Sequence, residues 1–240
     1  MLRISVGRMA DYLVQPSLVK GRLAGTIFGM RERGRGVFVI TAVLAVLTLV
    51  LAYGIRRLRA DPSALPYDQR LWTEFPRLLV TRTRFREMLK PTANERMLEI
   101  GPGTGYYALR VAGWLSPGGT LDILDIQQQM LDHTMRRARE IGVENIIPAR
   151  GDARDLPYQD NAFDAAYLVA TLGEVPDKQR ALEELCRVLK PGGRLVVGES
   201  QPDPHMVGLR TLRSLAQAAG LAFQRRTGGP LGYFVSFKVL

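Results

Sequence analysis

The sequence contains very few of the residues that form disulfides and metal sites. It has one cysteine, Cys186, and two histidines among 240 residues. A single cysteine excludes an internal disulfide, and so few thiols and imidazoles disfavour a zinc site. We therefore expect no metal ion, and we interpret Cys186, in the stretch EELCRVLK, as a small buried side chain.

Acidic residues are scarce in the N-terminal quarter of the chain. Residues 1–60 contain ten lysines and arginines but only two acidic residues, so they carry +8 of the total net charge of +10. The basic charge therefore belongs to one part of the sequence, and not to a broad surface that would attract nucleic acid. We expect no nucleic-acid partner.

Charged residues are absent from Gly36–Ile55, GVFVITAVLAVLTLVLAYGI. A helix of these 20 residues would be about 30 Å long, which matches the hydrocarbon core of a bilayer. Arginines flank both ends, which leaves the orientation undecided, and no small-residue cleavage site of a secretory signal follows. We predict a retained transmembrane helix over residues 36–55; a buried core helix is the alternative.

The basic segment before it, residues 1–35, has more than one interpretation. Residues 10–30 are moderately apolar but are interrupted by Pro16 and Lys20. They are compatible with an amphipathic stretch in the membrane interface, with a re-entrant hairpin, or with a basic tail attracted to anionic lipid head groups.

Residues 56–94 are interpreted as a linker and a leading helix. Pro62 and Pro66 mark the linker, and the stretch TEFPRLLVTRTRFREMLK has a helical pattern that ends at Pro91. In residues 95–240, short apolar strands alternate with helical segments. This alternation predicts an α/β domain with a doubly wound parallel sheet covered on both faces, and we expect the last strand to be antiparallel.

The first strand of this domain runs into a glycine-rich turn that contains Gly101, Gly103 and Gly105. Glycines at a strand-to-helix turn let a ligand approach the backbone, although tight packing alone would also explain them. A dinucleotide-binding turn requires a small residue where this chain has Tyr106, and Glu99 would repel a pyrophosphate. The turn therefore favours a ligand with a positive group and disfavours an NAD(P)-linked oxidoreductase.

Two aspartates follow the next strands. Asp125 ends the second strand, where a carboxylate can accept hydrogen bonds from both hydroxyls of a ribose; a helix N-cap is its alternative role. Asp152 follows the third strand and could accept a bond from the exocyclic amine of a base, while the N–H of Ala153 reaches a ring nitrogen; a plain turn residue is the alternative. Together with Glu99 and the glycines, these residues predict one nucleoside pocket. Asp122 is interpreted as a surface residue.

Four stretches carry a resemblance to a known family. They are, in chain order, LEIGPGTG, LDILDIQQQML, GDARDLPYQDNAFDAAYLVATLGEVPD and ALEELCRVLKPGGRLVVGE. In this order and spacing they resemble the motifs of class I S-adenosylmethionine-dependent methyltransferases, and residues 95–240 look like a methyltransferase type 11-like domain. The resemblance implies S-adenosylmethionine as the cofactor and a Rossmann-like seven-stranded sheet of order 3-2-1-4-5-7-6.

The resemblance also assigns parts of the cofactor to residues of this chain. The methionine part would lie on the glycine turn, the adenosine part at the ends of the second and third strands, and the transferred methyl after the fourth strand. In that order, the residues implied are Gly101, Gly103 and Gly105, with Glu99 near the amino end; Asp125 for the ribose, Ile126 for the adenine face, and Asp152 and Ala153 for the adenine edge; and Ala170 and Thr171.

The implied chemistry needs little acid–base machinery. A methyl group on a sulfonium is already activated, so the enzyme must mainly align the acceptor and exclude water. We therefore assign no catalytic residue. Glu174, Tyr67 and His205 are candidates for substrate contact or proton removal, but we interpret them as a helix-start acid, a packing residue of the linker and a solvent-facing loop residue.

The predicted function is methyl transfer at a membrane to a small acceptor. A lipid-like acceptor would be, for example, a phospholipid head group or a prenylated quinone; a soluble acceptor is the alternative, because an anchor can serve localisation alone. The alternative is a non-catalytic, membrane-tethered pseudo-methyltransferase that acts as a binding module. Because the cofactor is cytosolic, we expect the catalytic domain to face the cytoplasm, held by a single-pass or re-entrant anchor. No residue points to a particular acceptor atom or oligomeric state.

Overall fold

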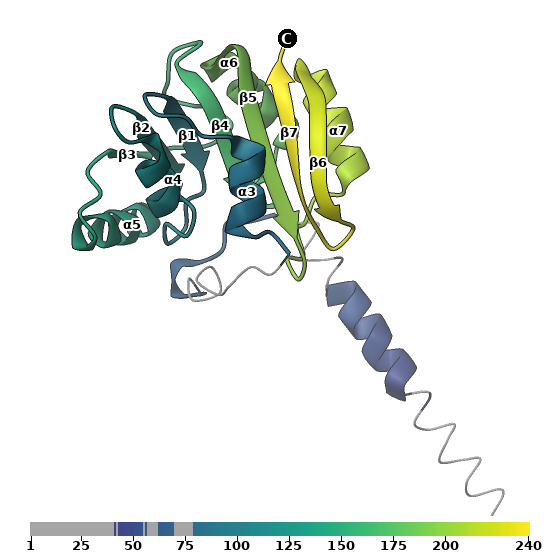
Figure 1. Cartoon of the computed structure of the whole chain (residues 1–240). Coiled ribbons are helices and arrows are strands. Elements are labelled where there is room, and N and C mark those ends of the chain that lie inside the picture. The colour runs from purple at the N-terminus through teal and green to yellow at the C-terminus, as the bar shows by residue number, and fades with distance from the viewer. Residues whose placement is uncertain (1–40, 42, 55, 57–61, 70–78) are drawn as a thin grey trace, which may run out of the picture. The chain divides into compact units, whose positions relative to one another are not determined.

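The computed structural model describes residues 41, 43–54, 56, 62–69 and 79–240 (Figure 1). The chain divides into two units, Met1–Arg56 and Arg57–Leu240, which are described separately. The basic segment 1–35 lies outside the described residues, and so do residues 36–40, 42 and 55 of the predicted membrane span.

The described residues of the first unit, 41, 43–54 and 56, are helical. Its large apolar side chains are more than half exposed, and they are Val43, Leu44, Val46, Leu47, Leu49, Val50, Leu51 and Tyr53. No helix within the described ranges combines the length and the hydropathy that crossing a bilayer requires. Since the predicted span is described only in part, a membrane helix over residues 36–55 stays a prediction.

The second unit contains a seven-stranded sheet of order β3-β2-β1-β4-β5-β7-β6, which confirms the predicted order. The first five of these strands in space are parallel, and β7 runs antiparallel to both of its neighbours, as expected. The strands are β1 (Arg96–Ile100), β2 (Thr120–Asp125), β3 (Ile146–Arg150), β4 (Phe163–Val169), β5 (Leu189–Ser200), β6 (Leu221–Gly229) and β7 (Gly232–Val239).

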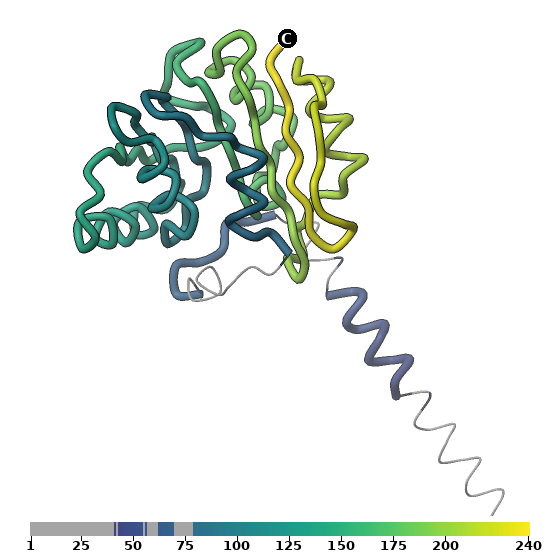
Figure 2. The backbone as a smooth tube through the Cα atoms, in the orientation of Figure 1, coloured from purple at the N-terminus to yellow at the C-terminus, as the bar shows by residue number. Residues whose placement is uncertain are grey.

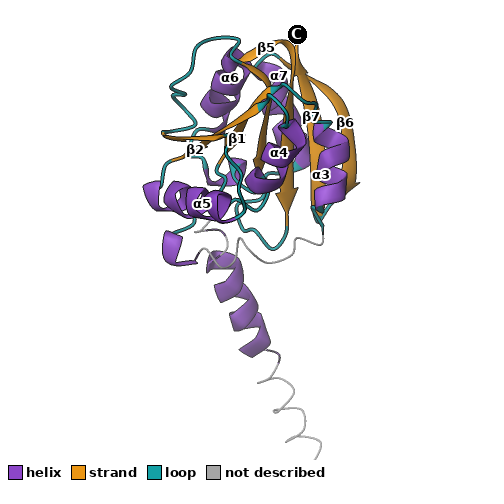
Figure 3. Ribbon diagram, turned by 60° about the vertical axis from the view of Figure 1, so that its left-hand side comes forward, coloured by secondary structure: helices purple, strands orange, loops and turns teal. Residues whose placement is uncertain are grey.

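Helices cover both faces of this sheet (Figures 1 and 3). Helices α3 (Arg82–Leu89), α4 (Ala108–Leu115) and α5 (Gln128–Glu140) pack on one face. Helices α6 (Lys178–Val188) and α7 (Leu209–Ala218) pack on the other. There are also two short 3-10 helices in the described residues. η1 (Tyr67–Gln69) precedes α3 in the chain, and η2 (Leu172–Glu174) lies between β4 and α6.

The central strands are apolar on both sides because each face of the sheet meets a layer of helices. In β4, Ala165 and Tyr167 belong to the core under α3 and α4, whereas Ala166 and Leu168 belong to the core under α6 and α7. All four side chains are fully buried. This packing fixes the direction of β4 and therefore the position of the loop that follows it.

The leading helix is shorter than the described part of its predicted range. Helix α3 begins at Arg82, where the side chain of Thr81 caps it by accepting the N–H of Arg84 at 3.4 Å. It ends at Leu89, and Lys90 follows in the left-handed conformation. Residues 70–78 of the predicted range lie outside the described residues.

Asp122 is not a surface residue, so that interpretation was wrong. Only 1% of its surface is exposed, and it accepts two hydrogen bonds from the guanidinium of Arg96, at 2.8 and 3.0 Å. Arg96 lies 26 residues away and starts the neighbouring strand. The register between β1 and β2 therefore creates a polar partner that makes burial of the carboxylate tolerable.

Candidate functional site

The residues predicted to form a site gather at one edge of the sheet, where the parallel strands end. The glycine turn follows β1, Asp125 ends β2, Asp152 follows β3 and Ala170 follows β4. In Figure 1 this is the lower edge, toward which β5 points, whereas the C-terminus lies at the upper edge. Ligand sites of doubly wound sheets lie at this edge.

The glycine turn has a backbone that other residues would not adopt without strain. Gly101, Gly103 and Gly105 have φ of +66°, +56° and +82°. A Cβ on Gly101 would lie 2.4 Å from Cγ2 of Thr171, in the loop after β4. Glycine at this position therefore allows the two loops to meet, and the turn is shaped by close approach as well as by dihedral angle.

Helix α5 holds the turn in place. The hydroxyl of Thr134 donates to the carbonyl of Gly103 at 2.9 Å, and Arg137 donates to the carbonyl of Thr104 at 2.7 Å. Two carbonyls of the turn are therefore occupied by side chains of α5. The sequence did not single out Thr134 or Arg137, because their partners lie about 30 residues away.

Asp125 is a buried carboxylate, only 7% exposed, at the end of β2. Its hydrogen bonds come from backbone N–H groups: Gln127 at 2.9 Å, together with Gly103 and Ile126. Burial is the largest influence on this group and raises its pKa above the usual range, although these N–H groups oppose the shift. The next residue, Ile126, is 52% exposed, so an apolar side chain stands beside the carboxylate.

Glu99 lies in the interior beneath the turn. It is 2% exposed and accepts a hydrogen bond from the hydroxyl of Tyr167 at 2.7 Å. Burial, followed by the nearby charge of Glu99, raises the pKa of Tyr167 well above its ordinary value. Glu99 is therefore part of a buried polar pair, whichever part of a ligand it faces.

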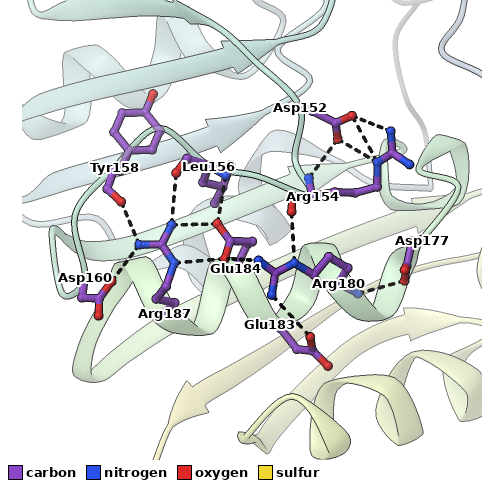
Figure 4. A network of polar contacts seen from close by, with 10 residues as sticks. All are labelled: Asp152, Arg154, Leu156, Tyr158, Asp160, Asp177, Arg180, Glu183, Glu184 and Arg187. Atoms are coloured by element: carbon purple, nitrogen blue, oxygen red, sulfur yellow. Dashed lines mark hydrogen bonds and ion pairs between the residues drawn. The ribbon is translucent and has the colours of Figure 1, made fainter.

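Asp152 forms a close ion pair with Arg154 on its own turn (Figure 4). Both carboxylate oxygens accept from the guanidinium, at 2.6 to 3.1 Å, and one also accepts the N–H of Arg154 at 2.9 Å. This pairing lowers the pKa of Asp152. Ala153 is buried and packs into the core under α6 and α7. The sequence analysis missed Arg154.

The loop after β4 starts with Ala170 at φ +53°, an unusual conformation for a residue other than glycine. Its N–H donates to the carbonyl of Gly198 at 2.8 Å, which keeps it beside β5. Thr171 then turns toward the glycine loop and donates to the carbonyl of Val169 at 3.2 Å. Strained backbone of this kind is enriched at ligand sites.

Residues 62–69 cross the same edge, and we call them the strap; Figure 2 shows this stretch below the sheet. The N–H of Leu65 donates to Glu174 at 3.3 Å, and its carbonyl accepts from Gln127 at 2.9 Å. The hydroxyl of Tyr67 lies 3.3 Å from Nδ1 of His133. The strap therefore connects the loop after β4 with the start of α5.

The structure also describes the surroundings of the three residues considered for substrate contact. Glu174 is the acidic residue in the single turn of η2, and its carboxylate also accepts the N–H of Leu65 in the strap. Tyr67 packs against His133. His205 is not solvent-facing: its side chain is 13% exposed, and its carbonyl would lie 2.1 Å from a Cβ on Gly173. The loop that carries His205 is thus packed on η2.

The sequence analysis also missed Glu199, a fully buried carboxylate near the end of β5. Oε2 accepts the N–H of Val207 at 3.1 Å, whereas Oε1 has no hydrogen-bond partner among the described residues. Burial is the largest cause that raises the pKa of Glu199 to about 8, with repulsion from Asp203 and Glu174 adding to it and the charge of Lys178 opposing it. An unpaired buried oxygen is rare in folded proteins.

No group of histidine, cysteine, aspartate and glutamate side chains with the geometry of a metal site occurs in the described part of the chain. What the edge does present is bare backbone at the glycine turn, a buried carboxylate held by N–H groups, and an exposed apolar side chain next to it. This combination fits the sulfonium end, the ribose diol and the base of S-adenosylmethionine, since a diol can donate two hydrogen bonds to a carboxylate.

Comparison with protein families gives one match that covers most of this unit. Residues 70–215 match the model of the ubiE/COQ5 methyltransferase family. Among curated proteins, the demethylmenaquinone methyltransferase of Bacillus cytotoxicus is 28% identical over 138 residues, which is 58% of each chain. That of Lactobacillus johnsonii is 35% identical over 130 residues, 53% of each chain.

A third relative is the ubiquinone/menaquinone biosynthesis C-methyltransferase UbiE of Pseudomonas fluorescens. It is 38% identical over 108 residues, which is 45% of this chain and 42% of the relative. The chain thus spans about two-fifths to three-fifths of the length of these relatives.

Solved structures share the fold. A SAM-dependent methyltransferase from Aquifex aeolicus superposes with a TM-score of 0.68 at 19% identity, over 74% of this chain and all of that chain. The [4+2]-cyclase SpnF superposes with a TM-score of 0.59 at 24% identity, over 65% of this chain and 78% of that chain. At such identities the likeness concerns the fold alone, and one of these two neighbours is named for another reaction.

Proposed function

The chain belongs to the ubiE/COQ5 methyltransferase family, and from this premise we propose that it transfers a methyl group from S-adenosylmethionine to a carbon atom of a quinone-like acceptor. The family match covers well over half of the chain. The acceptor class is taken from the names of the relatives, which act on demethylmenaquinone or in ubiquinone and menaquinone biosynthesis.

One observation carries the cofactor assignment: the buried carboxylate of Asp125 beside the glycine turn. Asp125 accepts hydrogen bonds from backbone N–H groups and stands next to the exposed side chain of Ile126. In the proposed complex, Asp125 accepts hydrogen bonds from the ribose hydroxyls and Ile126 packs on the adenine. Asp152 and Ala153 meet the edge of the base, and the bare backbone at Gly101 and its neighbours faces the methionine part.

When bound, S-adenosylmethionine supplies a methyl group on a positively charged sulfur, which needs no further activation. The residues of this chain hold the reacting groups in line and keep water out. The strap contributes to both, because Glu174 and Gln127 attach Leu65 across the edge of the sheet. Transfer to a ring carbon also releases a proton from the acceptor, and we assign no residue to remove it.

We also propose that the N-terminal segment holds the enzyme at a membrane, with the domain on the cytoplasmic side. Gly36–Ile55 contains no charged residue, and the described helix within it exposes large apolar side chains on all sides. A helix that is apolar all round needs an apolar environment. Tethering would raise the local concentration of an acceptor that dissolves in the bilayer.

A methyl-transfer assay tests the proposed activity. Full-length protein in detergent is incubated with methyl-labelled S-adenosylmethionine and a reduced, demethylated naphthoquinone, and the product is identified by mass spectrometry. We expect one methyl group on a ring carbon. Label on an oxygen atom, or no label in the quinone fraction, would contradict the proposed acceptor.

The alternative from the sequence analysis is a non-catalytic, membrane-tethered binding module. A binding module predicts that no extractable lipid is methylated, whether or not the protein binds the cofactor. The same labelled cofactor incubated with total membrane lipid separates the two, because any labelled lipid excludes the module.

A further inference from the structure

The loop between β3 and β4 is attached to helix α6 by a network of charged side chains (Figure 4). Its two central members are Glu184 and Arg187, which are separated by one turn of α6. The side chain of Glu184 is 4% exposed and that of Arg187 is 32% exposed. Burying a charge costs free energy unless the charge is paired and hydrogen-bonded, so the partners of Glu184 and Arg187 determine whether their burial is tolerated.

Every N–H group of the Arg187 guanidinium has an acceptor. Nε and one Nη2 hydrogen donate to the two carboxylate oxygens of Glu184, at 3.0 and 2.7 Å. The other Nη2 hydrogen reaches the carbonyl of Leu156 at 3.0 Å, and Nη1 reaches the carbonyl of Tyr158 at 2.8 Å and the carboxylate of Asp160 at 2.7 Å. Arginine has five such donors, and all five are used.

The carboxylate of Glu184 is saturated in the same way. Besides its two bonds from Arg187, Oε2 accepts the N–H of Leu156 at 2.9 Å and Oε1 accepts from Arg180 at 3.1 Å. Arg180 in turn donates through Nε to the carbonyl of Arg154 at 3.2 Å. The hydrogen bonds from Arg187 lower the pKa of Glu184, which keeps it ionised at neutral pH.

The network therefore fixes backbone atoms of residues 154–158 to a helix about 30 residues away in sequence. Those residues follow directly on Asp152 and Ala153, the pair that meets the base in the proposed complex. Asp152 and Asp155 are bridged within the loop, so a shift of the loop backbone would be passed to the carboxylate of Asp152.

We propose that Arg187 and Glu184 are positioning residues for recognition of the adenine base, because they fix the loop that carries Asp152 and Ala153. This inference rests on the proposed function. It goes further in assigning base selectivity to two residues of α6 that do not touch the cofactor.

The test compares two ligands that differ only at the edge of the base. S-adenosylhomocysteine has an exocyclic amine, and S-inosylhomocysteine has a carbonyl oxygen in its place. Isothermal titration of the full-length protein gives both dissociation constants, and their ratio measures base selectivity. For the wild type we expect the adenine ligand to bind at least about tenfold more tightly.

The main variant is the double substitution Arg187→Met with Glu184→Leu. It removes both charges and so leaves no unpaired buried carboxylate, which favours folding. We expect the selectivity ratio to fall about tenfold, because the loop is no longer fixed. Arg187→Lys keeps the charge but not the five-donor geometry, and it should lose selectivity as well.

Arg194→Met is the matched control. Arg194 also forms a bidentate pair, with Glu95 at 2.7 Å for both bonds. It also donates to backbone carbonyls, those of Leu89 and Lys90, but these lie at the start of the domain and not in the loop after β3. A merely structural role for Arg187 predicts that both variants lower Tm and neither changes the ratio. We expect both to lower Tm and only the Arg187 variants to change the ratio.

Two results would overturn the inference, and they are distinguishable. If the wild type is selective and the folded double variant has the same ratio, the positioning role is wrong and the proposed function stands. If the wild type binds neither ligand, the cofactor assignment is wrong, and the positioning role is wrong with it.

Discussion

Asp125 is the residue on which the cofactor assignment depends most. Replacing it with alanine removes the acceptor of both ribose hydroxyls, and bonds of this charge-assisted type contribute about 1.5–3 kcal/mol each. Two such bonds together are worth more than about 3 kcal/mol, so we expect Asp125→Ala to weaken binding of S-adenosylhomocysteine by at least about 100-fold in isothermal titration. Asp132→Ala, an exposed aspartate on α5, is the control. Equal affinity in the two variants would refute the ribose assignment.

Glu199 makes the stability of the domain depend on pH. Its pKa is raised to about 8 from an ordinary value of 4.5, so the folded state holds the proton more tightly than the unfolded state. The resulting stabilisation is complete below the unfolded pKa and is lost as the pH rises through 8. We therefore expect Glu199→Gln to gain Tm relative to the wild type between pH 5 and pH 9.

Each kcal/mol of this difference corresponds to about 2–4 °C for a domain of this size. Glu140→Gln, at an exposed position on α5, should follow the wild type at every pH. A constant offset between Glu199→Gln and the wild type would mean that Glu199 does not titrate with folding.

At this scale, sequence reasoning identified the polar residues that follow strands but not their partners. Asp125 and the glycines were found because their place at the end of a strand is visible in the sequence. Asp122 was misjudged because its burial depends on Arg96 from another strand. Glu199 looks like an ordinary acid in sequence, and only the packing of the loop up to Val207 makes it buried.

At the scale of elements, we predict opposite effects for a glycine-to-alanine substitution in the glycine turn and in a helix. Gly101→Ala places a side chain at φ +66° and 2.4 Å from Thr171, so we expect a lower Tm and loss of S-adenosylhomocysteine binding. Gly113→Ala, in the middle of α4 with open space around it, should raise stability by up to about 1 kcal/mol. Thermal denaturation and titration of both variants check this.

If Gly101→Ala binds as well as Gly113→Ala, the turn is only a tight bend and does not contact a ligand. The structural reading requires the two variants to differ in affinity and not in stability alone.

The strap gives a second prediction at this scale. Gln127→Ala removes the side chain that holds the carbonyl of Leu65, a loss of about 1 kcal/mol. We expect S-adenosylhomocysteine to dissociate about fivefold faster, measured by surface plasmon resonance. Gln128→Ala is the matched control, because its amide contacts only the exposed Asp132 among the described residues. Equal dissociation rates would mean that the strap does not retain the ligand.

The order of elements was largely predictable, and the strap was not. Apolar strands that alternate with helices imply a parallel sheet, because short crossovers leave few alternatives. The exact strand order came from a family resemblance and not from periodicity. The strap has no regular pattern, and its contacts through Leu65 and Tyr67 join residues more than 60 positions apart.

At the scale of the molecule, the two units make separate predictions. A protein that lacks residues 1–60 keeps the strap and the whole sheet, so we expect it to fold and to bind S-adenosylhomocysteine with the affinity of the full chain. We also expect it to lose association with lipid vesicles, measured by flotation. Retained flotation would place the membrane contact in the domain, and aggregation would mean that the N-terminal segment is part of the domain.

The network on α6 holds the neighbouring loop mainly by its main chain. The network binds Arg154 and Tyr158 through their peptide carbonyl groups and Leu156 through its N–H and its carbonyl, which every amino acid except proline provides. The path of the loop therefore depends on these main-chain bonds and on the buried side chains of Ala153 and Leu156, and less on the exposed side chains at positions 154 and 155. For protein engineering, this means that the exposed positions 154 and 155 can be diversified to accept cofactor analogues with altered bases, whereas Ala153 is buried in the core and has to be kept.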